Sequence, residues 1–313
     1  MSDERDRVTA SLIPSASGEI LVRSTSLVRR GLNLLELPTE EARVANLCER
    51  ANAGEAEAQC LLGARYANGQ GVPQDYAQAV QWFRRAAEQG DVRAQCRLGY
   101  AYSCGEGVPQ DDAHAVEWFR KAAEQGDAEA EYNLGVNYFL GLGVPKDYTQ
   151  AFHWFRKAAG RGDAEAQKNL GLAYSSGLGV PLDAAQAVNW FTKAAEQGNS
   201  DAQNHLGWAY LFGHGVPQDD VEAIQWLRKA AEQGQPEAQF GLGLMYDDGR
   251  GATQDYVEAH KWMNLAAAHT SAADEKRFLD GRDAVGRKMT PDQLSEAQTR
   301  ARDWTEAFAR RKP

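Results

Sequence analysis

The 313-residue chain lacks several features that define membrane-spanning and secreted proteins. It contains no run of about 18 apolar residues, which excludes a transmembrane helix on grounds of length. Its first residues, MSDERDRVTA, are charged and lack the apolar core of a signal peptide. The hydrophobic content of 43% is that of an ordinary globular protein. We therefore expect a cytoplasmic protein.

Cysteine is scarce, with Cys48, Cys60, Cys96 and Cys104 as the whole complement. Cys96 and Cys104 fall on one predicted helix, about 12 Å apart along its axis. That separation is too large for a disulfide. We expect these residues to be small thiols that are buried or half-buried.

Motifs that carry catalysis or hold a cofactor are also missing. The six histidines never show the spacing of an H-E-x-x-H metal pair, and nothing completes a metal site near His114 and Glu117. The chain has no G-x-S-x-G elbow, no S-x-x-K pair and no phosphate-binding G-x-x-x-x-G-K. The sequence therefore predicts no metal, no cofactor and no enzymatic activity.

Acidic side chains outnumber basic ones over most of the chain. The formal net charge is −10, and the region between residues 38 and 269 alone carries −12. An acidic surface repels phosphate backbones and anionic lipid. Nucleic acid is therefore disfavoured as a partner.

What the chain does have is a repeat of 36 residues in six ungapped copies, which we place at 55–90, 91–126, 127–162, 163–198, 199–234 and 235–269. Three columns show it most clearly. One column contains Gly63, Gly99, Gly135, Gly171, Gly207 and Gly243, and a second contains Tyr66, Tyr102, Tyr138, Tyr174, Tyr210 and Tyr246. The third contains Trp82, Trp118, Trp154, Trp190, Trp226 and Trp262.

Each copy predicts two helices. Gly105 and Gly107 end the first helix of the second copy, and Val108-Pro109 leads to the next one. The second helix begins at the aspartate of each GVPxD turn, with Gln or Glu three residues later in five copies, which is capping-box spacing. We expect Trp118 and Phe119 to be buried, and a side chain the size of Trp82 or Tyr66 to fill the space at the mid-helix glycine. One helix pair has too little interior to fold alone, so the copies must stack.

The pattern A-x-x-x-L-G-x-x-Y-x-x-G-x-G-V-x-x-D-x-x-x-A-x-x-W-x-x-x-A-A closely resembles the Sel-one-like repeats, over residues 54–269. This resemblance implies an all-α fold, a right-handed α/α superhelix related to tetratricopeptide repeats. It also implies a role as adaptor or scaffold in protein complexes. Some cysteine-rich bacterial members join neighbouring helices by disulfides, but most copies here contain no cysteine.

The ends of the chain depart from the repeat. Residues 37–54 predict an N-terminal capping helix at the start of the solenoid, which we place at 37–269. Residues 270–313 predict two capping helices with a basic tail, the second beginning at Thr290-Pro291. Within residues 1–36, GEILVRS predicts a strand and SLVRRGLNLLEL an amphipathic helix. We expect this segment to dock on the first repeat or to be partly disordered, and a tether to a partner or membrane surface is the alternative.

Candidate binding residues are those that vary between copies. By resemblance to tetratricopeptide proteins, the first helix of each pair lines a concave groove. Variable apolar positions there are Tyr100, Tyr132, Val136, Phe139, Leu172, Trp208, Leu211 and Phe240. They suit capture of a peptide or helix, with Trp208 as the best anchor, while contact between adjacent first helices is an equal alternative.

The resulting hypothesis is a non-enzymatic protein-binding adaptor. Its partner would be another protein, a peptide or helical segment whose basic residues meet the acidic first turns of the helices. Two alternatives remain open at this point. One is a hydrolase of cell-wall or antibiotic amides, and the other is a structural spacer that binds through its ends.

Overall fold

The computed structural model describes residues 12–14, 20–22, 39–268 and 272–311. These residues form helices apart from one short antiparallel pair of strands, β1 (Leu12–Pro14) and β2 (Ile20–Val22), in which Ile13 lies opposite Leu21. The strand predicted in GEILVRS is therefore confirmed at β2. The amphipathic helix expected at 26–37 lies outside the described residues. Two compact units, 1–147 and 148–313, are each considered by themselves below.

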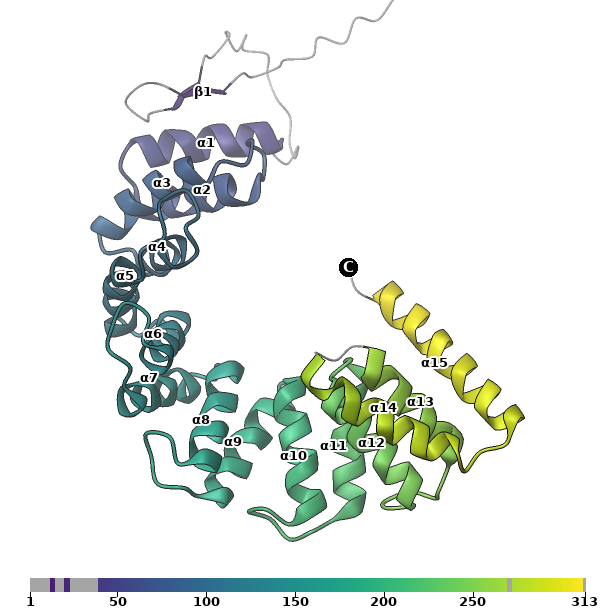
Figure 1. The fold of residues 1–313 in the computed structure, drawn as a ribbon. Coiled ribbons are helices and arrows are strands. Elements are labelled where there is room, and N and C mark those ends of the chain that lie inside the picture. Colours follow the sequence, from purple (N-terminus) through teal and green to yellow (C-terminus); the bar gives the residue numbers. More distant parts are fainter. Residues whose placement is uncertain (1–11, 15–19, 23–38, 269–271, 312–313) are drawn as a thin grey trace, which may run out of the picture. The chain divides into compact units, whose positions relative to one another are not determined.

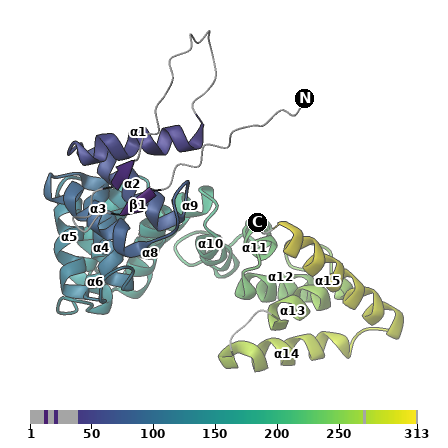
Figure 2. The ribbon, with the colours of Figure 1, turned by 90° about the horizontal axis from the view of Figure 1, so that it is seen from above.

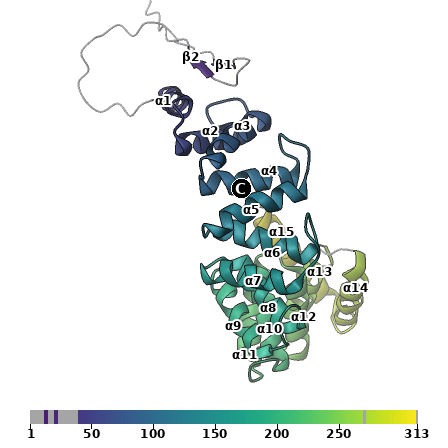
Figure 3. The same ribbon diagram turned by 90° about the vertical axis from the view of Figure 1, so that its left-hand side faces the viewer.

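The described helices follow the sequence repeat (Figure 1). The first helices of the six copies are α2 (Ala56–Asn68), α4 (Val92–Cys104), α6 (Ala128–Leu140), α8 (Ala164–Ser176), α10 (Ser200–Phe212) and α12 (Pro236–Asp248). The second helices are α3 (Tyr76–Glu88), α5 (Asp112–Glu124), α7 (Tyr148–Gly160), α9 (Ala184–Glu196), α11 (Asp220–Glu232) and α13 (Tyr256–Ala268). The flanking helices are α1 (Glu40–Asn52), α14 (Ala272–Gly286) and α15 (Pro291–Arg311). Within the first unit the pairs α2–α3 and α4–α5 stack in sequence order (Figure 3).

The second helices begin at the predicted aspartate caps, but with only half of the capping box. Asp75 Oδ1 accepts from the backbone N–H of Gln78 at 2.9 Å. The N–H of Asp75 donates to the carbonyl of Tyr66 at 2.9 Å, so it is not available to the Gln78 side chain. The same bond joins Asp111 to Tyr102. The turn is thus fixed to the end of the preceding helix.

Glycines end the first helices as predicted, and they also allow consecutive repeats to approach. Gly105 and Gly107 have φ of 73° and 74°, in the left-handed region. A Cβ at Gly107 would collide with the carbonyl of Tyr76 and lie 2.8 Å from the N atom of Ala77. The start of α3 therefore rests directly on the turn of the following copy.

The mid-helix glycine of the first helix packs against a ring close in size to the expected tyrosine, which is phenylalanine in the first, second and fourth copies. A Cβ at Gly63 would lie 2.7 Å from Phe83 Cδ1, and one at Gly99 would lie 2.8 Å from Phe119 Cδ1. Both phenylalanines are buried, at 5% and 2% exposure. The residue after the repeated tryptophan occupies this notch in the first, second, fourth, fifth and sixth copies.

The expectation that Trp118 is buried is wrong, since four of the six repeated tryptophans are only half-buried. Lys121 Nζ lies 3.8 Å from the centroid of the Trp118 ring, and each of the other five rings also has a Lys or Arg over it. These cations lie within cation–π range of the indoles. Trp82 and Trp262 are buried in the core, at 1% and 5% exposure, together with the phenylalanines and the repeated alanines and leucines.

Buried glutamines connect consecutive copies in a way the sequence analysis did not predict. Gln203, 4% exposed, donates from Nε2 to the carbonyl of Ala195 in α9 at 3.0 Å. Its Oε1 accepts from Gln233 at the end of α11 at 2.7 Å. Equivalent pairs occur at Gln59–Gln89, Gln95–Gln125 and Gln167–Gln197. These bonds satisfy backbone carbonyls at the ends of the second helices.

Helices also form at both predicted ends. Thr39 caps α1 through its side chain. At α15 a full capping box forms, in which Thr290 and Gln293 exchange backbone and side-chain bonds of 2.9 and 3.3 Å. In the second unit α13 packs against both α14 and α15 (Figure 2). No described helix combines the length and the apolar character needed to cross a membrane.

Candidate binding pockets between repeats

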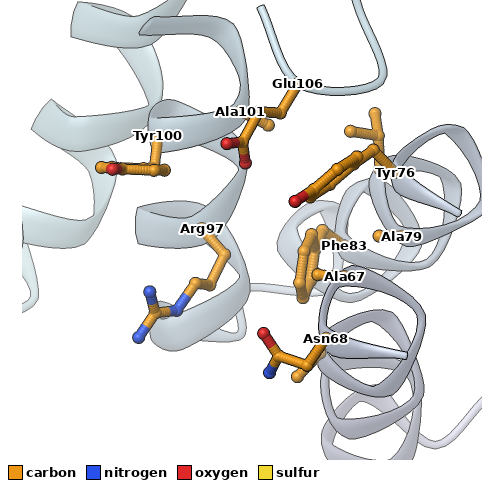
Figure 4. A pocket seen from close by; sticks show the side chains of 11 residues that line it. Ala67, Asn68, Tyr76, Ala79, Phe83, Arg97, Tyr100, Ala101 and Glu106 are labelled. Atoms are coloured by element: carbon orange, nitrogen blue, oxygen red, sulfur yellow. The ribbon is translucent and has the colours of Figure 1, made fainter. Parts of the chain in front are cut away.

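One pocket occurs at the same repeat position in both units. In the first unit it has a volume of about 520 Å³ and lies between α2, α3 and α4 (Figure 4). In the second unit it has about 260 Å³ and lies between α8, α9 and α10. All nine lining residues of the second pocket match lining residues of the first at a shift of three copies. They are Ser175, Ala184, Ala187, Val188, Phe191, His205, Trp208, Ala209 and His214, against Ala67, Tyr76, Ala79, Val80, Phe83, Arg97, Tyr100, Ala101 and Glu106.

The floor of the pocket is constant and apolar. Alanine, valine, phenylalanine and a second alanine recur in both pockets, and all of them are buried. Phe83 forms one wall of the first pocket and also packs against Gly63, so its ring is held by the stack itself. Packing between repeats thus leaves a preformed hollow where two copies meet.

The rim of the pocket differs between the two units. In the first unit Tyr76 and Tyr100 are exposed at 39% and 44%, and Arg97 and Glu106 add one charge of each sign. Figure 4 shows Arg97 and Tyr100 coming from α4, across from Phe83 on α3. One guanidinium nitrogen of Arg97 lies 3.7 Å from a carboxylate oxygen of Glu129.

In the second unit the rim is made of indole and imidazole rings. Trp208 Nε1 donates to Asn204 Oδ1 at 2.9 Å, and its ring stacks on Phe212 at 5.6 Å between centroids. Phe212 is 55% exposed. His205 stacks on Phe191 at 4.8 Å, and burial lowers the pKa of this histidine, which favours its neutral form.

In the fifth copy the protein's own side chains close this position. Leu211 stands where Ser175 stands in the fourth copy and is 4% exposed. Arg250 donates to both carboxylate oxygens of Asp220 at 3.0 and 2.6 Å, and to the carbonyl of Leu211 at 3.1 Å. The hydrogen bond from Arg250 lowers the pKa of Asp220. The pocket is therefore open in the fourth copy and filled by side chains in the fifth.

The predicted groove residues fall into different environments. Tyr100 and Trp208 line the two pockets, and Phe139 is 36% exposed. Tyr132, Val136 and Leu172 are half-buried. Leu211 and Phe240 are buried, and the Phe240 ring is stacked on Phe278 of α14 at 4.7 Å.

Trp208 also takes part in contact between adjacent first helices. A Cβ at Gly241 in α12 would lie 2.8 Å from Trp208 Cζ2. Second helices also contribute to the pockets, through Tyr76 and Ala184, which were not among the predicted groove residues. The signal for this contribution was present in the variable column Tyr76, Asp112, Tyr148, Ala184, Asp220 and Tyr256, at or beside the start of each second helix.

The cysteines form no disulfide, and Cys104 is exposed whereas the other three are buried. Burial raises the pKa of Cys60 to about 12 and also raises that of Cys96, so both are thiols at neutral pH. Among the described residues no group of three His, Cys, Asp or Glu side chains is placed to hold a metal ion. The pockets offer apolar contact and a few polar groups, which is the character of a binding surface.

Comparison with known proteins agrees with this architecture. Six consecutive segments match the Sel1 repeat, at 56–91, 92–127, 128–163, 164–199, 200–235 and 236–271. The chain belongs to the Sel1 repeat family. Members of this family are typically protein-interaction scaffolds, and the Sel1 repeat fold is generally non-enzymatic.

Solved Sel1 repeat structures resemble the chain. A Sel1 repeat protein from Oxalobacter formigenes is 32% identical, with a TM-score of 0.62, and the match covers 73% of this chain and 97% of that one. The antigen c5321 of uropathogenic Escherichia coli is 30% identical, with a TM-score of 0.47 and coverage of 86% and 81%. No curated protein matches the chain.

Proposed function

We propose that this Sel1 repeat protein is a non-enzymatic scaffold that binds a peptide or helical segment of another protein. In this proposal the two pockets receive apolar side chains of the partner. Tyr100 and Trp208 contact those side chains at the rims. The acidic surface of the repeats attracts basic residues that flank the anchors in the partner.

The observation that carries this proposal is the division of the pocket into a constant floor and a variable rim. The floor positions also hold consecutive repeats together, which explains why they recur. At equivalent rim positions the first pocket has Ala67, Arg97 and Tyr100. The second pocket has Ser175, His205 and Trp208 there. Stacking of repeats leaves these positions open to change, and binding anchors are typically aromatic side chains beside a desolvated pocket.

Exposed apolar side chains near both pockets support the same function. Tyr76 and Tyr100 line the first pocket and are 39% and 44% exposed, and Phe212, which stacks on Trp208 of the second pocket, is 55% exposed. Large apolar side chains gathered beside a pocket mark interaction sites more often than isolated ones do. Phe240 and Leu211 are left out of the proposed surface because they are buried.

The test is a substitution that fills the second pocket and leaves its anchor residue, Trp208, in place. Leu211 already occupies the Ser175 position in the fifth copy, so Ser175→Leu is compatible with the repeat fold. The matched control is Ser176→Leu, on the next exposed residue of α8, which does not line the pocket. Partners would be identified by affinity capture with the natural chain, and the affinity of a purified partner would be measured by calorimetry.

We expect Ser175→Leu to weaken binding at least about tenfold, the equivalent of 1.4 kcal/mol, and Ser176→Leu to leave it unchanged. Ala67→Leu is the corresponding variant for the first pocket. Circular dichroism and thermal melting establish that each variant keeps its helices. Unchanged affinity in both Ser175→Leu and Ala67→Leu would refute pocket binding.

A further inference from the structure

A different cavity lies among α13, α14 and α15, beyond the pockets between repeats. Its volume is about 410 Å³, within the range of small-molecule sites. His260 and Asn264 of α13 line it, with Arg282 and Gly286 of α14 and Gln298 of α15. Six of its eight lining residues have polar or charged side chains, and the other two are Gly286 and Leu294.

His260 is a buried histidine in the wall of this cavity. The residue is 5% exposed, and its Nδ1 atom makes no hydrogen bond. A Cβ at Gly286 would lie 3.6 Å from its Cδ2 and 3.7 Å from its Nε2, so this edge of the ring faces the cavity-lining glycine. The unbonded Nδ1 lies on the other side of the ring from this edge, so the nitrogen that His260 presents to the cavity is Nε2.

The charge around the cavity is positive, although the whole chain carries −10. Arg282 and Arg287 both line it, and its one carboxylate, Asp283, accepts from Arg282 at 2.9 and 2.7 Å. No carboxylate among the described residues pairs with Arg287, whereas the adjacent Lys288 binds Asp247 at 2.7 Å. Burial and nearby Arg282 lower the pKa of His260, so its ring is neutral and carries one N–H donor.

We propose that this cavity binds a small anion, the phosphate or carboxylate group of a small molecule. Arg282 and Arg287 supply the positive charge, since guanidinium groups bind such oxygens with paired donors. His260, Asn264 and Gln298 supply neutral donors around them. This site is independent of the partner-binding pockets, because it shares no residue with them.

The probes are inorganic phosphate and succinate, titrated separately into the full-length chain. Calorimetry would measure the dissociation constants, and NMR of the imidazole nitrogens would report whether His260 is perturbed. Saturable binding of phosphate alone would assign a phosphate site, and binding of succinate alone would assign a carboxylate site. A shift of the His260 resonances with either probe supports the proposal.

Two variants test the assignment. Arg287→Gln removes the unpaired cation, and we expect at least about a tenfold loss of affinity. Its matched control is Arg310→Gln, an exposed position of α15 paired only with Glu306 at 3.5 Å among the described residues, which should bind as the natural chain does. Gly286→Leu changes no charge but covers the open edge of His260, and it should abolish binding while helical content is retained.

The proposal is overturned if neither probe binds saturably. It is also overturned if Arg287→Gln and Arg310→Gln weaken binding equally, because the anion would then respond only to overall charge. If Arg287→Gln does not fold, Gly286→Leu still tests the proposal. It replaces glycine, which disfavours helix, so we expect this variant to fold.

Discussion

Replacing Gly207 with alanine tests how tightly the repeats are built. A Cβ at this position would lie 2.6 Å from Leu227 Cγ and 3.1 Å from the backbone N atom of Leu227. Leu227 is 0% exposed, so its side chain has no solvent into which to move. Overpacking of this kind costs about 1–3 kcal/mol. The gain from glycine to alanine within a helix is about 1 kcal/mol, so we expect a net loss of about 1 kcal/mol.

Gly160→Ala is the matched control. Gly160 is the last residue of α7, and apart from its chain neighbours and its own helix backbone no described atom lies within 4 Å of a Cβ built there. The same substitution should therefore leave stability unchanged or raise it by about 0.5 kcal/mol. Urea denaturation followed by circular dichroism would give the free energy of unfolding of each variant.

A double-mutant cycle isolates the contact. Leu227→Ala alone should cost about 2–5 kcal/mol through loss of burial and the cavity it leaves. In combination with Gly207→Ala it should cost less than the sum of the two, because the added methyl group enters the vacated space. The reasoning fails if Gly207→Ala stabilises the protein as much as Gly160→Ala does.

Three other changes have defined outcomes. Gln203→Ala should lower the free energy of unfolding by about 1–3 kcal/mol, since it removes one buried and one partly buried hydrogen bond. Exposed Gln186→Ala should change it by less than about 0.5 kcal/mol in urea denaturation. The hydrogen bond from Arg250 lowers the pKa of Asp220 in the folded protein. The pair therefore stabilises the fold at pH values above about 4, the ordinary carboxyl pKa. This contribution is lost as the pH falls through the lowered pKa of Asp220 in the folded state. The stability deficit of Asp220→Asn should therefore shrink on acidification in denaturation midpoints, and a deficit that stays constant would contradict this pairing. Cys104 should be the one thiol that reacts quickly with a disulfide reagent in the native protein, and fast reaction of a second thiol would show that the burial is wrong.

Much of the fold could be predicted from the residues because each helix boundary is local. An aspartate cap at Asp75 and a left-handed glycine at Gly105 act within a few residues of the backbone they cap. Their repetition every 36 residues is sufficient to predict helix pairs in order. The sequence predicted only the size of the side chain that packs at a mid-helix glycine. Trp82 and Phe83 are adjacent in sequence, and only the rotation of α3 about its axis decides that Phe83 meets Gly63.

The candidate site was predicted only in part. Variation between copies identified Tyr100 and Trp208, since a varying column is visible without coordinates. It could not show that Leu211 and Phe240 are buried, because Arg250 and Phe278 approach them from elsewhere in the chain. The pocket at His260 was not predicted, although His260 stands in the sixth copy where the other copies have Val80, Val116, Phe152, Val188 and Ile224. Its other walls come from the C-terminal segment outside the repeat, and only the packing of α14 and α15 on α13 brings them together.

The sequence by itself determined the helices, their order and the Sel1 repeat, because caps, turn glycines and hydrophobic spacing act over one or two helical turns. The tertiary structure alone decided which hollows stay open. Whether a pocket is open depends on which side chains of neighbouring copies, or of α14 and α15, reach into it. The distances between these side chains and the pocket are set by packing across the stack.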